Sequence, residues 1–212
     1  MKVRLELKVN DKVVATKSYV KNFGLLFYGL MLAPGGTPIG TPGTIASAPS
    51  VVLPDGTTSN TYTEWYSSAS SVSYGGGTPM GCFASDNDSS YGIVVGSGTN
   101  AVTLGDYKLA SQITHGTSSG QLDYDSHTII SPTVDTTNQK AYFSFVRSFV
   151  NRSGSTITVS ECGIMARSYW KDGNAVRQDI KYLIIRDLID PPIQVPNTAT
   201  LTITYYFEVS LS

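Results

Sequence analysis

Charged side chains are scarce in this sequence. Lys, Arg, Asp and Glu make up 15% of its 212 residues and leave a formal net charge of −1, whereas globular proteins average about 25% charged residues. This composition excludes an acidic disordered chain and a globally basic nucleic-acid-binding protein. Residues 22–107 contain no Lys or Arg at all. That part of the chain therefore cannot form the cationic cluster that a phosphate or an anionic membrane requires.

Cysteine and histidine are also rare. The two cysteines, Cys82 and Cys162, either form one disulfide in an oxidising compartment or remain two buried thiols, and the sequence leaves both possibilities open. His115 and His127 are twelve residues apart, and no cysteine lies at a zinc-ligand spacing from either of them. We therefore expect no metal site and no cofactor.

No long apolar run is present. The most apolar window, residues 23–33, has 11 residues, about half of the roughly 20 that a membrane-spanning helix needs. The first residues alternate charged and apolar side chains instead of forming the basic end and apolar core of a secretory signal. We expect neither a membrane span nor a signal peptide.

The N-terminal part, residues 1–32, combines two strand patterns with one helical pattern. Residues 2–9 and 12–20 alternate apolar and polar side chains around Asn10 and Asp11, which predicts a β-hairpin with a polar turn. Residues 21–32 carry apolar side chains at helical spacing and end before Pro34, which predicts one short helix. We expect the apolar side chains of this helix to make assembly contacts; they are Phe23, Leu26, Phe27, Leu30 and Met31.

Residues 33–79 are rich in Pro, Gly, Ser and Thr, which predicts a long arm with loops. Three aromatic side chains, Tyr62, Trp65 and Tyr66, lie in this charge-poor region. Aromatic rings stack on sugar rings, although they are commoner in cores and at subunit contacts. A glycan contact at these residues is therefore an alternative to an assembly role.

Residues 80–212 contain short runs rich in Thr, Val, Ile, Tyr and Phe, separated by turn residues. These runs are residues 91–95, 121–130, 140–151, 156–167, 179–188 and 199–211. Within 142–150, Phe143, Phe145, Arg147 and Phe149 share one face, and within 201–209 the apolar residues alternate with polar ones. Recurrent strands with short connections predict an all-β fold, an antiparallel β-sandwich of jelly-roll-like type.

Three short motifs suggest chemistry, but their surroundings favour simpler interpretations. Residues 96–101 match G-x-G-x-x-A, yet β-branched residues follow where a dinucleotide site needs a helix. Residues 116–120 match G-x-S-x-G around Ser118 beside His115, without the strand and helix of a nucleophile elbow. Residues 86–90 alternate Asp and Asn like a calcium loop but lack its Gly and Glu. We therefore expect no catalytic residues and no enzyme.

From about residue 91 to the end, a little over half of the chain, several strand-and-turn phrases resemble those of a group of viral proteins. The phrases are residues 91–99, 106–109, 113–116, 149–159, 161–165, 183–187 and 195–205. They are similar to segments of uncharacterised β-rich structural proteins encoded by archaeal viruses, tailed phages and proviruses. The resemblance implies a virion component, such as a turret, decoration, tail or collar protein, and assigns no residue a functional role.

The sequence thus predicts a non-enzymatic viral structural protein, located in the virion, that assembles with itself and with other virion proteins. A receptor- or glycan-binding module is the alternative, with a host receptor or glycan as partner. Neither interpretation involves nucleic acid, because residues 22–107 carry no Lys or Arg and the basic residues near the N-terminus alternate with apolar ones as on one face of a strand.

Overall fold

The computed structural model describes residues 2–8, 50–60, 80–171 and 177–210. Within these ranges every paired strand is antiparallel to its neighbour and no helix is present. The all-β prediction is therefore confirmed for the described residues. The predicted helix at 21–32 and the second strand of the predicted hairpin lie outside them.

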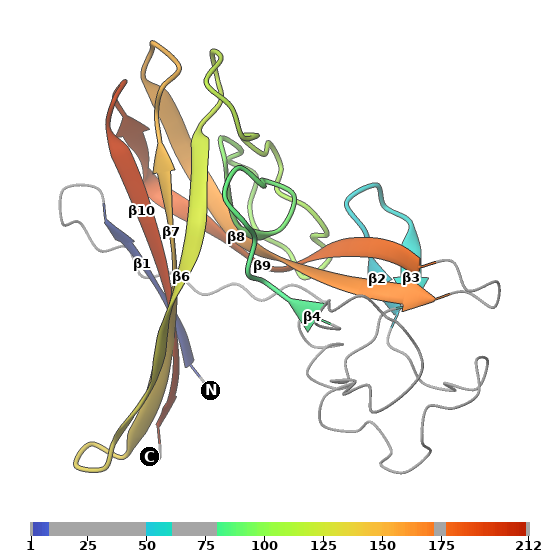
Figure 1. Ribbon diagram of the computed structural model, residues 1–212, viewed down its shortest axis with the longest axis vertical. Coiled ribbons are helices and arrows are strands. Elements are labelled where there is room, and N and C mark those ends of the chain that lie inside the picture. The colour runs from blue at the N-terminus through green and yellow to red at the C-terminus, as the bar shows by residue number, and fades with distance from the viewer. Residues whose placement is uncertain (1, 9–49, 61–79, 172–176, 211–212) are drawn as a thin grey trace.

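The first sheet, called sheet A here, has the order β1-β10-β7-β6 (Figure 1). Its strands are β1 (Lys2–Lys8), β10 (Thr200–Ser210), β7 (Lys140–Val150) and β6 (Asp123–Asp135). β1 pairs along its whole length with β10, from Lys2 opposite Glu208 to Lys8 opposite Thr202. Residues 2–8 therefore form an edge strand of sheet A.

The second sheet, sheet B, is built around β8 (Ile157–Lys171). β9 (Arg177–Val195) pairs with β8, and so do β4 (Met80–Gly81) and β5 (Gly92–Gly96). A small separate ladder joins β2 (Ser50–Val52) to β3 (Thr58–Asn60).

Sheets A and B enclose one apolar core, as the alternating patterns predict. Phe145 and Phe149 from β7 and Leu201, Ile203 and Tyr205 from β10 are buried on the inner face of sheet A. Opposite them lie Ile93, Val95, Ile164 and Ile185 of sheet B, which are buried and share one face with Cys162, the residue whose Sγ contacts Tyr205 of β10. The architecture is thus sandwich-like, and its two layers are also joined by the side-chain hydrogen bonds described below.

The main difference from the predicted strands occurs in β9. Pro191 and Pro192 predict a turn, but the strand continues to Val195. Its pairing with β8 is irregular there, since Leu188 lies opposite Glu161 and Ile193 opposite Val159. The prolines lie within this irregularity, where the ladder needs no donor from them.

Candidate functional site

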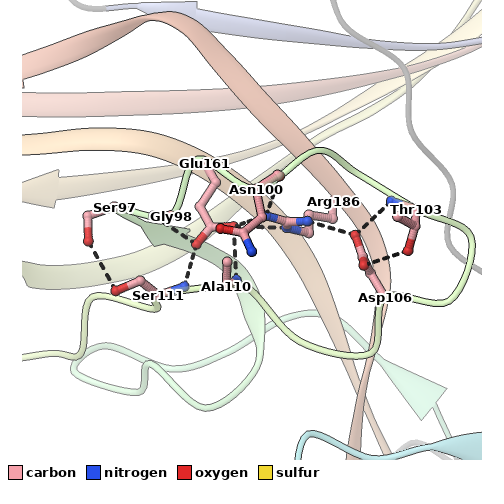
Figure 2. A network of polar contacts seen from close by, with 9 residues as sticks. All are labelled: Ser97, Gly98, Asn100, Thr103, Asp106, Ala110, Ser111, Glu161 and Arg186. Atoms are coloured by element: carbon pink, nitrogen blue, oxygen red, sulfur yellow. Dashed lines mark hydrogen bonds and ion pairs between the residues drawn. The ribbon is translucent and has the colours of Figure 1, made fainter.

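A buried network of charged and polar groups joins sheet B to the loop 97–112, which follows β5 (Figure 2). We call it the Glu161 network. Glu161 of β8 is fully buried, and its Oε1 accepts hydrogen bonds from the amides of Gly98 (3.1 Å) and Ser111 (2.7 Å). Its Oε2 accepts from the amide of Ala110 (3.0 Å) and from Nε (2.9 Å) and Nη2 (2.8 Å) of Arg186. Both carboxylate oxygens are therefore occupied by donors of the protein itself.

The cation of this network is Arg186, a buried residue of β9. Its Nη1 donates to Oδ2 of Asp106 at 2.7 Å and its Nη2 to the carbonyl of Asn100 at 3.0 Å. Burial would lower the pKa of Arg186, but Asp106 and Glu161 outweigh burial and raise it. For Asp106, burial would raise the pKa, yet hydrogen bonds from Thr103 and Arg186 and the Arg186 charge lower it. Asp106 and Arg186 are thus held in their charged forms.

The Glu161 network explains why glycines occupy positions 96 and 98 of the G-x-G-x-x-A motif. A Cβ on Gly96 would lie 2.5 Å from the carbonyl oxygen of Ser111, and a Cβ on Gly98 would overlap Oε1 of Glu161. No helix follows the motif in the structure. The glycines therefore allow close approach of a protein carboxylate, and the arrangement lacks the helix N-terminus that would hold a pyrophosphate.

A second buried cation, Arg147 of β7, binds the backbone instead of an acid. Its guanidinium donates to five carbonyl oxygens at 2.7 to 3.2 Å, those of Ser85, Asp88, Tyr91, Ile93 and Asp125. It also lies 4.8 Å from the centroid of the Tyr124 ring. Burial lowers the pKa of Arg147 to about 10, so it remains a cation at neutral pH. Arg147 therefore fastens the segment before β5 to sheet A.

His127 lies beside Arg147 in β6 and is buried and neutral. Its Nε2 accepts the amide of Ile93 at 2.8 Å, so the ring proton is on Nδ1, which faces the carbonyl of Ala84 at 3.0 Å. Its ring stacks on Phe145 with centroids 4.4 Å apart. Burial, and then the charge of Arg147, lowers the pKa of His127 to about 4. The side chain joins the two sheets and is not available as a base.

The two cysteines are free thiols, so the disulfide is not formed in the structure. Sγ of Cys162 lies 3.3 Å from the hydroxyl of Tyr205, which donates to Oδ2 of Asp187 at 3.2 Å. Burial raises the pKa of Cys82 to about 12, and burial and the Asp187 charge raise that of Cys162 well above its ordinary value. In the structure Cys162 is therefore a buried thiol and Cys82 a partly buried one.

The G-x-S-x-G segment forms a tight exposed turn. The amide of Ser118 donates to Oε1 of Gln121, and the amide of Gln121 to the carbonyl of Ser118. Nδ1 of His115 accepts the amide of Tyr124 at 3.2 Å and lies 3.5 Å from Oδ1 of Asp123. The hydrogen bonds of Ser118 and His115 thus hold the turn on β6, as expected for a loop.

The Asp-rich segment 86–90 is also a turn. Oδ1 of Asp88 accepts the amide (2.8 Å) and the hydroxyl (2.5 Å) of Ser90. Among the described residues, no three His, Cys, Asp or Glu side chains are grouped so that they could hold a metal ion. The residues that the structure describes include no helix long and apolar enough to cross a membrane.

The predicted contact residues themselves lie outside the described part of the chain. This holds for the assembly residues Phe23, Leu26, Phe27, Leu30 and Met31 and for the aromatic residues Tyr62, Trp65 and Tyr66. What the structure adds is a group of exposed apolar side chains on the β6–β7 hairpin. Ile129, Val134 and Phe143 lie on one face of the hairpin, and Ile130 and Tyr142 lie on the other.

The sequence contains a signal of the buried charges Arg147 and Glu161. Arg147 stands on the same alternating face as Phe145 and Phe149, and Glu161 precedes the apolar run 162–166. A charge on a face that the pattern assigns to the core must be paired or hydrogen-bonded inside the protein. What such a residue binds depends on distant segments, so its partners cannot be deduced from the pattern.

Comparisons with protein-family models, with curated proteins and with solved structures found no match to this chain.

Proposed function

We propose that this protein is a non-enzymatic structural component of a virus particle that assembles with copies of itself and with other virion proteins. Its place is the capsid surface or the tail, as a turret, decoration or collar protein, with a jelly-roll-like body. An N-terminal hairpin and short helix, within residues 1–32, would add contacts to its neighbours.

The observation that carries the proposal is the apolar surface of the β6–β7 hairpin. Ile129, Val134 and Phe143 are exposed there, although each belongs to a sheet whose other half forms the core. A contiguous exposed apolar surface is typical of a protein-protein contact. An apolar surface at one end of a two-layer body is a place where a neighbouring protein of an assembly would bind.

The buried polar groups support the same proposal. Arg147, Glu161 and Arg186 bind backbone or side-chain groups of this chain, and each fixes a loop to a sheet. Side chains with this role make the body rigid, which a particle component requires. The resemblance of residues 91–205 to viral structural proteins points in the same direction.

The test is quantitative mass spectrometry on particles released by cells that encode the protein. After density-gradient purification, peptides of this chain should follow those of the major capsid protein in a constant ratio across the particle peak. An abundant cytosolic protein of the host, followed in the same fractions, is the control for carry-over. A chain that stays in the soluble fractions would contradict the proposal.

A further inference from the structure

The β6–β7 hairpin extends beyond the part of sheet A that sheet B covers, and its connection lies at one end of the molecule (Figure 1). From residue 128 onward every side chain of β6 up to Val134 is exposed, and so are residues 141–143 of β7. Nearer the body the same two strands carry the buried residues Tyr124, His127, Phe145 and Phe149. The inner face of sheet A thus has a covered half and an uncovered half.

The strand register assigns each exposed side chain to one face. Ile129 lies opposite Phe145, a core residue, so it belongs to the inner face. Ile130 lies opposite Ser144 and belongs to the outer face. Beyond the irregularity after Ile130, Val134 lies opposite Ala141 on the inner side. Phe143 lies opposite Phe207 there, and the two rings stack with centroids 4.8 Å apart.

Charge divides the two faces of the hairpin. Asp135, Lys140 and Glu208 have the register of the outer face, where Nζ of Lys140 lies 3.6 Å from Oε1 of Glu208. The inner-face residues of β6, β7 and β10 in this half are Ile129, Val134, Ala141, Phe143 and Phe207, none of which is ionisable. The uncovered inner face is therefore apolar and uncharged, and it continues the core without a polar boundary.

The edge of the hairpin is less suited to a partner than this face. β6 is an edge strand, but it contains Pro132 and two irregularities, between residues 124 and 127 and between 130 and 133. Proline and bulges at an edge prevent another strand from adding to it. The tip is held by Asp135, whose carboxylate accepts the amides of Thr137 and Asn138 at 3.1 and 3.0 Å. Because the tip is held in place and the edge is protected, a partner would contact the face of the hairpin rather than its edge.

We infer that the uncovered inner face packs against the same face of a second copy of this chain, about a two-fold axis, so that each copy supplies the missing second layer to the other. In a two-fold contact a residue near the axis meets its own equivalent, and a charge there would meet a like charge. The inner face carries none, whereas the outer face would bring Asp135, Lys140 and Glu208 into the contact. The inference rests on the proposed function, since it specifies how the assembling copies meet.

The size of the face makes this contact weak by itself. Three strands about 4.8 Å apart and seven residues at about 3.3 Å each give a footprint of about 330 Å², below the roughly 800 Å² per partner of a stable interface. The dimer formed by two isolated chains should therefore have a Kd of about 1 µM or higher. Several such contacts in one particle would reinforce each other through the high local concentration of copies.

The test exploits two adjacent isoleucines of nearly equal exposure on opposite faces, Ile129 at 55% and Ile130 at 52%. We would measure the mass of the full chain by sedimentation velocity from about 1 to about 500 µM, the range over which a weak contact of this size dissociates. Wild type and Ile130→Lys should show a concentration-dependent dimer. Ile129→Lys should raise the dimer Kd at least about 100-fold, since both copies lose apolar contact and bury an ammonium group.

A second pair of variants is used if Ile129→Lys does not fold. Val134→Lys on the inner face and Thr133→Lys on the outer face then repeat the comparison nearer the tip. Because the contact is apolar, the wild-type Kd should change little with moderate NaCl.

Three results would overturn the inference. A wild-type chain that is monomeric at every concentration would mean that another segment or another protein covers the face. Equal effects of the inner-face and outer-face variants would mean that the face is not the contact. Dissociation by moderate salt alone would indicate a charged interface. None of these results bears on whether the chain is found in particles, which the gradient experiment decides.

Discussion

Glu161→Gln is the substitution that tests most sharply how the loop 97–112 is held. The amide has the size of the carboxylate, but it replaces one acceptor oxygen by a donor. If the NH₂ group takes the place of Oε1, the amides of Gly98 and Ser111 lose their acceptor. If it takes the place of Oε2, the amide of Ala110 and two N–H groups of Arg186 lose theirs.

The expected cost follows from that count. A buried donor without an acceptor costs about 1–3 kcal/mol, at least two are created in either orientation, and Arg186 keeps only Asp106 as counterion. Glu161 is fully buried, so water cannot replace the lost contacts. We expect Glu161→Gln to lower the free energy of unfolding by about 3–5 kcal/mol, a large part of the 5–15 kcal/mol or so that a domain commonly has.

A double variant separates this account from a simple ion pair. Replacing both partners of a buried ion pair by apolar residues is often nearly neutral. Here three of the five donors to Glu161 are backbone amides, which Glu161→Met/Arg186→Met would leave without an acceptor. We therefore expect the double variant to remain at least about 3 kcal/mol less stable than the wild type.

The assay is urea unfolding followed by circular dichroism, together with hydrogen exchange at the amides of Gly98, Ala110 and Ser111. In Glu161→Gln these amides should exchange faster while those of β7 and β10 remain protected. A double variant within about 1 kcal/mol of the wild type, with these amides still protected, would refute the reasoning.

Three further predictions concern the core. His127 has a pKa of about 4 in the folded protein against an ordinary value of 6.5, so the unfolded chain binds more protons between these two pH values. The free energy of unfolding should therefore fall by at most about 3 kcal/mol as the pH drops from 6.5 to 4. In urea unfolding of His127→Gln this dependence of the free energy on pH should be absent. Cys162 should not react with a thiol reagent until urea unfolds the chain, because the residue is buried and burial raises its pKa; fast labelling of Cys162 in the native protein would contradict its burial. Gly163→Ala should cost about 1–3 kcal/mol in the same unfolding assay, because its Cβ would lie 2.5 Å from the carbonyl oxygen of Ile185. Gly105→Ala is the control, because its Cβ would meet only Oγ1 of Thr103, at 3.7 Å.

Local pattern was sufficient for most of the fold. Alternation placed Phe145, Arg147 and Phe149 on one face of β7, and the structure buries all three. The turn residues after 151 lie between β7 and β8 as predicted, whereas β9 continues through the turn predicted at Pro191 and ends at Val195. These features depend on neighbours along the chain, which a single sequence displays.

The contacts that join distant segments could not be predicted in this way. Glu161 binds amides about 50 and 63 residues away, and Arg147 binds carbonyls 54 to 62 residues away. The uncovered half of sheet A is equally invisible in the sequence, because Ile129 and Phe145 follow one pattern although only Phe145 is buried. Which half of a strand is covered depends on how far the opposite sheet extends.

Immunogold electron microscopy of the released particles tests the central claim most directly. Antibodies against the chain should label intact particles at a fixed and repeated position, on the capsid surface, the collar or the tail. Labelling absent from every particle, in a preparation where the same antibodies detect the chain in infected or induced cells, would contradict the assignment to the virion.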